Sequence, residues 1–294
     1  MTTKQPLPFG GDWTAEKLEC IRKYLYAYTK ALKDQPFHLT YIDAFAGTGY
    51  CGKGKTGKNG EHLFGDLAQE DTQKFLKGSA RIALEVEPSF DNYIFVDHDP
   101  NNCAELDNLK NEFPLKQGKI TIVNKEANEY LKELTSSNWK NQRKRGVLFL
   151  DPYGMQVSWS TVQSIAQTQA IDMWYLFPIA AVNRLLRKDA TIGSAERNRL
   201  NLIFGTEDWE QVFYQRKTYP TLFGEDEIIQ KIASIDAIKD YLLERLRIEF
   251  AGIAENPLVL ENSRNSPIFL LCFAVGNKNA ADLAKRIAQH ILKR

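Results

Sequence analysis

Four carboxylate side chains stand at the ends of short apolar runs, where a parallel sheet would gather them at one edge. They are Asp43, Asp97, Glu126 and Asp151. A carboxylate at such an edge can accept hydrogen bonds from ribose hydroxyls or from an amine. The glycine-rich segment AGTGYCGKGKT, residues 46–56, follows the first of them. These residue types and their spacing predict that several loops bind one nucleotide-like ligand.

The glycine-rich segment fits two different patterns. Counted from Gly49 it is G-x-x-x-x-G-K-T, the spacing of a P-loop that cradles phosphates. Counted from Asp43 it is D-x-F-x-G-x-G, the first loop of a class I methyltransferase. The run GVLFLD, residues 146–151, also resembles the apolar strand ending in aspartate that holds magnesium in P-loop enzymes. The patterns alone leave both interpretations open.

The residues that follow argue against the P-loop. A P-loop helix begins within the G-K-T triplet, so that its backbone amides converge on the phosphates. Here Gly57 and Gly60 follow Thr56 closely, and a glycine inside a helix costs about 1 kcal/mol relative to alanine. In the other interpretation Gly47 and Gly49 permit a tight turn and a close backbone approach to the ligand. The methyltransferase-type loop is therefore favoured, and a P-loop nucleotide hydrolase is the less favoured alternative.

Apolar periodicity indicates the elements that position these residues. Five runs of strand length are separated by helix-like segments, an order typical of a largely parallel α/β sheet. A helix capped by Thr14 is expected before the first strand. One face of that helix holds Leu18, Ile21, Leu25, Tyr28 and Leu32. The predicted strands are residues 38–45, 93–99, 119–124, 146–151 and 171–177.

The pattern changes after the fifth predicted strand. Residues 181–252 contain no strand-like run, so a helical insertion that forms a substrate lid is expected there. One clear helix in it carries Ile235, Ile238, Leu242, Leu246 and Phe250 on one face.

The last part of the chain returns to the sheet. Residues 257–262 and 267–275 predict an antiparallel hairpin. A basic helix follows, with Leu283, Ile287 and Ile291 facing inward. Residues 1–180 and 253–294 are thus expected to form a Rossmann-like class I methyltransferase core, mostly parallel with a C-terminal antiparallel hairpin.

Bulk properties add few constraints. The chain of 294 residues has 38 Lys and Arg against 37 Asp and Glu, and its net charge of +1 creates no global field for nucleic acid. The four cysteines are scattered, without a C-x-x-C pair or a disulfide framework. No signal-peptide core and no apolar run of membrane-spanning length occurs. We expect a cytoplasmic protein with reduced thiols, no membrane partner and no metal site.

Several segments of the chain resemble a known family. Trp13-Thr14 with Lys17-Leu18, then YIDAFAGTG, GSARIALE, FVDHDP and FLDPYGMQVSW, are similar to segments of the three-Cys-motif partner proteins, TcmP. These segments span most of residues 12–180, and Thr48 departs from the proline expected there. The resemblance implies a bacterial protein with a class I methyltransferase-like core. It also implies a partner, a radical-SAM-like protein with a three-cysteine motif.

The stretch DPYG, residues 151–154, carries a second resemblance. It is similar to the DPPY motif of amino-methyltransferases and to the DPFG motif of tRNA guanine exocyclic-amine methyltransferases. It departs from DPPY because one proline is missing and the aromatic residue is displaced by one position. The resemblance implies that Asp151 accepts a hydrogen bond from the target amine, Pro152 offers its carbonyl and Tyr153 stacks on a base. The alternative is a strand-ending Asp-Pro turn with a packed tyrosine.

These observations together predict an S-adenosylmethionine (SAM)-dependent N-methyltransferase, acting on an exocyclic amine of a base in nucleic acid or in a nucleotide-like substrate. The alternative from another class is a noncatalytic or regulatory partner of the radical-SAM-like protein. The expected catalytic residues are Asp151, Pro152 and Tyr153. The residues expected to bind SAM are Asp43, Phe45, Gly47, Gly49, Asp97, His98, Glu126, Ala127 and Asp151. Those expected to bind the substrate are Tyr153, Gly154, Arg184 and Lys17.

Three local basic clusters are candidate contacts for nucleic acid, although charge runs are usually solvated faces. The third is favoured, because it follows the fifth predicted strand and opens the insertion. The clusters are Lys53, Lys55 and Lys58; Lys140, Arg143, Lys144 and Arg145; and Arg184, Arg187, Lys188, Arg197 and Arg199.

Overall fold

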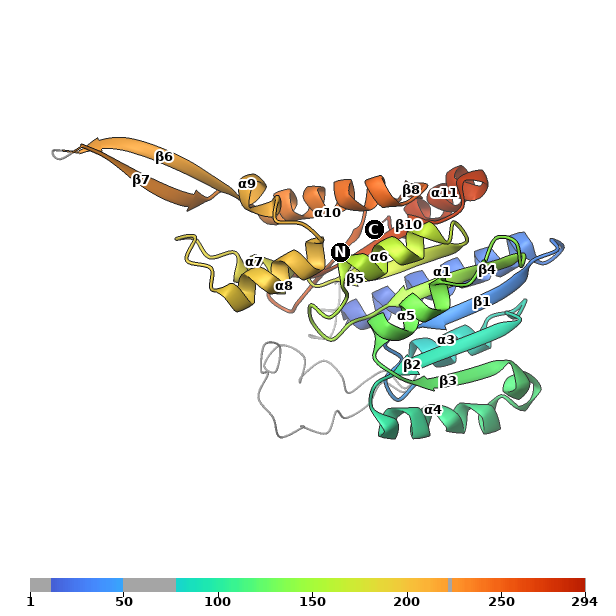
Figure 1. Ribbon diagram of the computed structural model, residues 1–294. Coiled ribbons are helices and arrows are strands. Elements are labelled where there is room, and N and C mark those ends of the chain that lie inside the picture. Colours follow the sequence, from blue (N-terminus) through green and yellow to red (C-terminus); the bar gives the residue numbers. More distant parts are fainter. Residues whose placement is uncertain (1–11, 50–77, 222–223, 294) are drawn as a thin grey trace, which may run out of the picture.

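A central sheet of eight strands organises the protein (Figure 1). The computed structural model describes residues 12–49, 78–221 and 224–293. The strand order is β3-β2-β1-β4-β5-β10-β8, with β9 paired to β10 outside this path. The strands are β1 (His38–Asp43), β2 (Asn92–Asp97), β3 (Ile120–Asn124), β4 (Lys144–Leu150), β5 (Ile171–Phe177), β8 (Gly252–Ile253), β9 (Leu258–Glu261) and β10 (Pro267–Val275).

The pairing confirms the predicted strand directions. Strands β1 to β5 are mutually parallel, and β10 runs antiparallel to β5, β8 and β9. All five predicted parallel strands are present, and so is the predicted hairpin, as β9 and β10. The sheet is thus mostly parallel with an antiparallel end, as the sequence predicted.

Helices connect the strands and cover the sheet. They are α1 (Asp12–Leu32), α3 (Ser79–Glu85), α4 (Pro100–Glu112), α5 (Ala127–Thr135), α6 (Trp159–Gln167), α7 (Ile179–Leu185), α8 (Ser194–Phe204), α9 (Trp209–Phe213), α10 (Ile235–Glu249) and α11 (Ala281–Ile291). Short 3-10 turns occupy Pro114–Lys119 and Lys278–Ala280.

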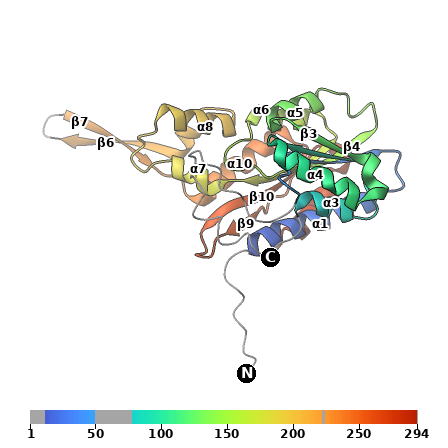
Figure 2. The same cartoon turned by 90° about the horizontal axis from the view of Figure 1, so that it is seen from below.

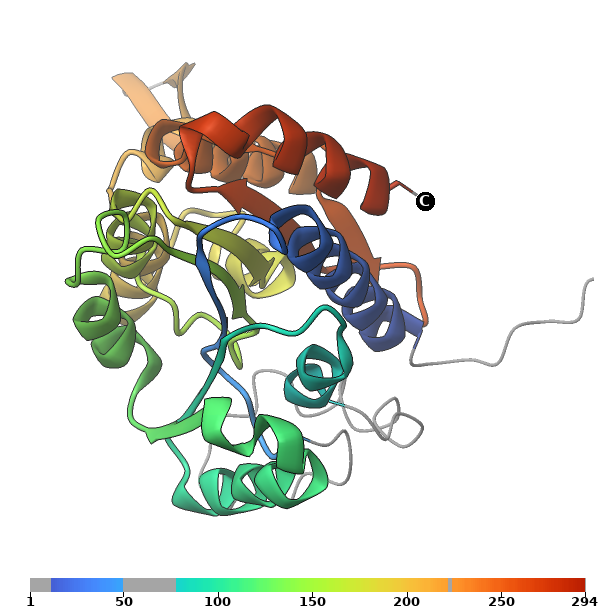
Figure 3. The same cartoon turned by 90° about the vertical axis from the view of Figure 1, so that its right-hand side faces the viewer.

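The helices lie on both faces of the sheet (Figure 3). On one face α5, α6 and α10 pack against side chains that include Ile42 and Leu148. On the other face α1, α3, α4 and α11 pack against side chains that include Tyr41 and Phe149. Because successive residues of a strand point to opposite faces, Tyr41 and Ile42 belong to different layers. Parallel strands buried on both faces are continuously apolar, which is the pattern that made them predictable.

Helix α1 is anchored on the sheet by a buried hydrogen bond. It begins at Asp12, two residues before the predicted start, so the prediction that Thr14 caps the helix is wrong. The hydroxyl of Tyr24 donates to Oδ2 of Asp172 in β5 at 2.8 Å, and the backbone N–H of Gly276 donates to Oδ1 at 3.1 Å. Burial raises the pKa of Asp172 to about 6, while these two hydrogen bonds oppose the rise.

The insertion contains a two-stranded antiparallel ribbon, so the expectation that it holds no strand is wrong. Strands β6 (Tyr214–Thr221) and β7 (Gly224–Lys231) pair with each other only, and the ribbon projects from the body (Figures 1 and 2). The helices α7 to α10 flank it in the sequence. A ribbon that lies on no other sheet needs no buried face, and the alternating apolar pattern of a strand is therefore absent from its sequence.

The last helix confirms part of its predicted inward face, because Ile287 and Ile291 pack against the core. Leu283 was expected to face inward, but it is 50% exposed. The buried residues of α11 are Ala281, Ala284 and Ala288. Small side chains let this helix lie close to α1 and β10 (Figure 3). A helix face made of alanines is not indicated by a periodic pattern of large apolar residues.

Two further expectations concern thiols and membranes. Cys20 and Cys272 are buried and Cys103 is partly buried, and these three described cysteines form no disulfide. No helix in the described ranges combines the length and the apolar character needed to cross a membrane.

The anchor of α1 can be tested by replacing Tyr24 with phenylalanine. Because the pKa of Asp172 is raised to about 6, its carboxyl group is ionised in the folded protein at pH 8 and largely protonated at pH 5. The lost hydrogen bond should cost about 1–3 kcal/mol of unfolding free energy at pH 8, and less at pH 5. Urea unfolding at both values measures this difference. Tyr26→Phe, an exposed tyrosine of the same helix, is the control. Equal losses at the two pH values would contradict the assignment.

Candidate functional site

The predicted acidic residues meet at one edge of the sheet. Asp43 and Asp97 end the parallel strands β1 and β2, and Asp151 directly follows β4. Strands β1 and β4 are neighbours, and the order of strands reverses between them. Ligands of open α/β sheets bind beyond the carboxyl ends of the strands at such a reversal. The geometry therefore places these carboxylates where a ligand site is expected.

Asp43 is fully buried below this edge. Its carboxylate accepts from Oγ of Ser79 at 2.5 Å and from the backbone N–H of Phe45 at 3.4 Å. Burial raises the pKa of Asp43 to about 7. The charge of Asp151 adds to the rise, whereas the Ser79 hydrogen bond and the charge of Lys17 oppose it. Asp43 is therefore a group that changes its charge near neutral pH.

Helix α1 brings a lysine to the same place. Nζ of Lys17 lies 2.5 Å from Oδ2 of Asp151, across 134 residues of sequence. Lys17 is buried, and the Asp151 side chain is 27% exposed. The ammonium group also lies 5.3 Å from the ring centre of Trp13 and 5.7 Å from that of Phe149. One ammonium group thus faces two carboxylates, those of Asp151 and Asp43.

The loop after β1 has the backbone shape that its glycines allow. Gly47 and Gly49 have φ values of +57° and +73°, in the left-handed region. A Cβ at Gly47 would meet no atom of the described residues within 4 Å, so these residues leave the space before this backbone open. At Gly49 a Cβ would lie 3.1 Å from side-chain carbons of Leu106 and Leu109. The two glycines therefore have different roles: one leaves room at the site and the other packs on α4.

Asp97 fastens the loops after β1 and β2 to each other. Its Oδ2 accepts from the N–H of Gly47 at 2.9 Å, and its Oδ1 accepts from the N–H of Asp99 at 2.8 Å and from Nδ2 of Asn102 at 3.1 Å. A carboxylate has about four lone-pair directions, so these three donors leave one. The described residues thus leave one lone-pair direction of Asp97 for a ligand hydroxyl, and its contact with SAM stays a prediction.

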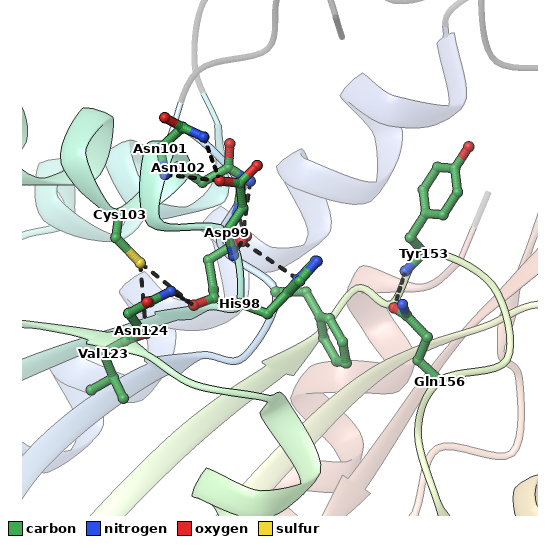
Figure 4. A network of polar contacts seen from close by, with 12 residues as sticks. His98, Asp99, Asn101, Asn102, Cys103, Val123, Asn124, Tyr153 and Gln156 are labelled. Atoms are coloured by element: carbon green, nitrogen blue, oxygen red, sulfur yellow. Dashed lines mark hydrogen bonds and ion pairs between the residues drawn. The ribbon is translucent and has the colours of Figure 1, made fainter. Parts of the chain in front are cut away.

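Polar contacts extend from Asp97 to the next strand. Nδ2 of Asn124 donates to the Asp97 carbonyl at 3.1 Å. Figure 4 shows this network with the ring of His98 beside it and Tyr153 opposite. The His98 side chain is 78% exposed, so its ring is open to a ligand.

Glu126 caps helix α5. Its Oε2 accepts from the N–H of Glu129 at 2.9 Å and its Oε1 from Nδ2 of Asn128 at 2.7 Å. Ala127 is buried against the core. Both residues lie at the edge predicted for them, and the structure adds a capping function for Glu126 that the sequence analysis did not assign.

Asn128 was missed by the sequence analysis and holds the DPYG loop. Its Nδ2 donates to the carbonyl of Gln156 at 2.9 Å, and its Oδ1 accepts from the N–H of Ser158 at 2.9 Å. Oε1 of Gln156 in turn accepts from the N–H of Tyr153 at 3.1 Å (Figure 4). An Asn one residue into a helix is too common for its type alone to mark this function.

Tyr153 is exposed to solvent. Its residue surface is 67% accessible, whereas Pro152 before it is buried and Gly154 after it has a φ of +89°. The alternative of an Asp-Pro turn with a packed tyrosine is therefore wrong. An aromatic ring stands in solvent directly beside Asp151.

The basic clusters lie at different ends of the sheet. Lys140 and Arg143 precede β4, and Lys144 and Arg145 are its first residues, so this cluster lies at the edge opposite to Asp151. The guanidinium of Arg145 lies 4.4 Å from the ring centre of Phe37, a contact within the fold. The cluster is therefore separated from Asp151 by the length of β4, and its contact with nucleic acid stays a prediction.

The other two clusters have different outcomes. Arg184 is exposed in α7, which begins just beyond the end of β5 and therefore at the same edge as Asp151. Lys53, Lys55 and Lys58 lie outside the described residues, as does all of the P-loop pattern after Gly49. Within the described ranges no group of three or more His, Cys, Asp or Glu side chains is placed to hold a metal ion.

Comparison with known proteins bears on the fold. No protein-family model matches the chain, and no curated protein matches it. Similar solved structures include LPL1258 of Legionella pneumophila, a protein of family DUF519, with 14% identity and a TM-score of 0.49 over 96% of this chain and 92% of that one. The candidate methyltransferase yhhF of Escherichia coli has 13% identity and a TM-score of 0.28 over 72% and 87% of the two chains. A conserved hypothetical protein of Streptococcus pyogenes has 13% and 0.31 over 70% and 92%.

The class of the protein follows from its own strand order. The order β3-β2-β1-β4-β5 is that of nucleotide-binding doubly wound sheets, and β10 joins it in the antiparallel direction. With the ligand edge between β1 and β4, this is a methyltransferase-like α/β fold.

The two loop glycines make a matched pair of variants. Replacing either with alanine forces a side chain into a left-handed backbone, at a cost of about 1–2 kcal/mol. Gly49→Ala should lose about 1–3 kcal/mol more, because its methyl group would collide with Leu106 and Leu109. Chemical denaturation compares the two variants with the wild type. A loss at Gly47→Ala as large as that at Gly49→Ala would show that the loop is packed differently.

Proposed function

We propose that the protein is a SAM-dependent N-methyltransferase that modifies an exocyclic amine of a base, in nucleic acid or in a nucleotide-like substrate. One observation carries the proposal. At the reversal of strand order, the Asp151 carboxylate is held by the buried Lys17 and stands next to the exposed ring of Tyr153. A carboxylate beside an aromatic face suits a flat base that carries an amine.

The residues around the loop after β1 fit the cofactor. The open space before Gly47 allows a close approach to the backbone, and Asp97 has one lone-pair direction left for a ribose hydroxyl. The exposed ring of His98 offers a stacking face for adenine, with Glu126 and the backbone of Ala127 at its edge. Bound SAM supplies a methyl group on a positively charged sulfonium.

Charge balance at the site also favours a cation. Asp43 and Asp151 together carry two negative charges when ionised, against the single positive charge of Lys17. Burial of this excess negative charge is unfavourable, and the raised pKa of Asp43 expresses it. A cationic ligand restores neutrality, whereas a nucleoside triphosphate would add negative charge. The proposal therefore prefers a sulfonium cofactor to the nucleotide of a P-loop enzyme.

Asp151 orients the acceptor in this proposal. Its Oδ2 is bound to Lys17, so Oδ1 is the atom that accepts from the target amine. As the amine nitrogen attacks, it gains positive charge, which the Asp151 carboxylate stabilises without an intervening base. The carbonyl of Pro152 accepts the second amine hydrogen, and Tyr153 stacks on the ring. Alignment and exclusion of water supply the rest of the rate.

Cofactor affinity should depend on pH through Asp43. Below its pKa of about 7 the carboxyl is protonated, and a cationic ligand must release that proton to gain the charge interaction. SAM should therefore bind about 5–10-fold more weakly at pH 6 than at pH 8, since affinity falls up to tenfold per unit below the pKa. Isothermal titration calorimetry measures both constants. S-Adenosylhomocysteine has the same amine but no sulfonium charge, and it should show a smaller change; equal changes would oppose this assignment.

Catalysis should depend on the carboxylate of Asp151. Asp151→Asn should lower methyl transfer from labelled SAM to total RNA or DNA by about 10²–10³-fold, because the charge that stabilises the developing cation is lost. Asp151→Asn also loses the ion pair with Lys17, so circular dichroism must confirm its fold. Tyr153→Ala removes an exposed ring and should reduce transfer without changing stability. Unchanged methylation in both variants would favour a noncatalytic protein.

The segments that resemble the TcmP proteins support a further part of the proposal. They suggest that a radical-SAM-like protein with a three-cysteine motif is a partner of this chain. Methyl transfer by the purified chain alone, compared with transfer in the presence of that protein, separates an enzyme that acts alone from one that needs its partner.

A further inference from the structure

A groove lies at the base of the β6–β7 ribbon, outside the site described above. Its volume is about 570 Å³. It is formed where β7 meets the start of α10 and the end of α7 (Figure 1). Its polar lining residues are Asn183, Lys188, Gln230, Lys231 and Ser234.

Two lysines of the groove have only neutral partners or none. Nζ of Lys231 donates to the carbonyl of Asn183 at 3.1 Å and to its Oδ1 at 2.6 Å. Lys188 is exposed, and among the described residues no carboxylate lies within ion-pair distance of either ammonium group. Burial, with the nearby charge of Lys188, lowers the pKa of Lys231. The groove therefore holds positive charge that the fold does not neutralise.

Nearby acidic groups are occupied elsewhere. Oδ1 of Asp189, the neighbour of Lys188 in sequence, accepts from the N–H and hydroxyl of Thr191. Asp236, in the first turn of α10, pairs with Lys239 at 2.6 Å. Neither of these two carboxylates forms an ion pair with Lys188 or Lys231.

Backbone contacts hold the two lysines beside each other. The N–H of Lys231 donates to the carbonyl of Lys188 at 3.3 Å, and the hydroxyl of Tyr214 donates to the carbonyl of Arg187 at 2.9 Å. The segment after α7 is therefore fastened to the ribbon. Two lysines far apart in sequence share one groove because of these contacts.

We propose that this groove binds a backbone phosphate of a single-stranded polynucleotide. The inference rests on the proposed function, since α7 begins at the sheet edge where Asp151 and Tyr153 would receive the base. Lys188 and Lys231 supply the charge for a phosphate, and the amides of Asn183 and Gln230 supply donors for its oxygens. The acceptor is accordingly a base within a strand, and the groove holds a phosphate of that strand outside the reacting nucleotide.

Binding of a labelled, mixed-sequence single-stranded RNA at several KCl concentrations tests the groove, with single-stranded DNA of the same sequence as a second arm. Lys188→Gln should weaken binding several-fold and reduce the slope of log K against log[salt] by about 0.7, the value for one phosphate contact in single strands. Lys188→Arg should restore both. Lys132→Gln, which removes an exposed lysine of α5 that belongs to none of the three basic clusters, is the matched control and should change neither.

Polyglutamate, a polyanion without phosphate, is a further probe. Four outcomes would overturn the inference: equal effects of Lys188→Gln and Lys132→Gln, failure of Lys188→Arg to restore binding, no binding of either polynucleotide, or a loss of polyglutamate binding in Lys188→Gln that equals its loss of RNA binding. RNA binding without DNA binding, or the reverse, supports it and identifies the strand. If Lys188-dependent binding occurs but the chain transfers no methyl group, the proposed function fails and the phosphate groove stands. If methyl transfer depends on Asp151 but Lys188→Gln leaves polynucleotide binding unchanged, the phosphate groove is wrong and the proposed function stands.

Discussion

The structure depends on how it holds buried charge at the end of β1 and β4. An ion removed from water loses several kcal/mol of solvation, and a partner regains this only with good geometry. Lys17 and Asp151 have that geometry, because α1 lies across the sheet and carries the ammonium group to the carboxylate. The apolar face of α1, with Ile21 and Leu25 buried, places the helix, and the Tyr24–Asp172 hydrogen bond fastens it two turns further along.

Asp43 adds a second carboxylate to the Lys17–Asp151 pair, so that ionised carboxylates outnumber the ammonium group there. Burial, with the charge of a second carboxylate, raises its pKa to about 7, and among the described residues one ammonium group, that of Lys17, opposes the rise. A fold selected for stability alone would place an apolar side chain at this position. Perturbed carboxyl groups gather where a ligand completes the charge balance, and an apolar residue there would remove that selectivity for a cation. Under the proposed function, the arrangement exchanges some stability for a preference among ligands.

Sequence patterns predicted the elements whose side chains pack on the core in a regular order. Strands β1, β2, β4 and β5 are largely buried on both faces, and β3 is partly exposed at the end of the sheet; an apolar run predicted each of the five. The β6–β7 ribbon was not predicted, because it lies on no other sheet and shows no alternating pattern. In α11 the prediction was wrong for Leu283, because buried alanines make much of the contact beside Ile287 and Ile291.

The site divides in the same way. The strand-end position of Asp43, Asp97 and Asp151 follows from the order of elements, and the sequence predicted it. The Lys17–Asp151 contact joins residues 134 positions apart, and no spacing rule describes such a pair. Local composition also could not show that Asp97 already accepts three protein hydrogen bonds, since two of the donors come from its own loop and one from the loop after β1.

The net charge of +1 does not show that some basic side chains have partners within the fold while others, in the part of the chain that the structure describes, lack a carboxylate partner. Arg145, at the edge away from the ligand loops, stacks on Phe37 and lowers the pKa of Asp172, so its charge is used inside the fold. Lys188 and Lys231, on the insertion, have no carboxylate partner among the described residues. Two basic runs of similar composition thus differ in what remains for a partner molecule. Which charges can attract a ligand is decided by the contacts each one has already made, and the sum over the chain does not contain that information.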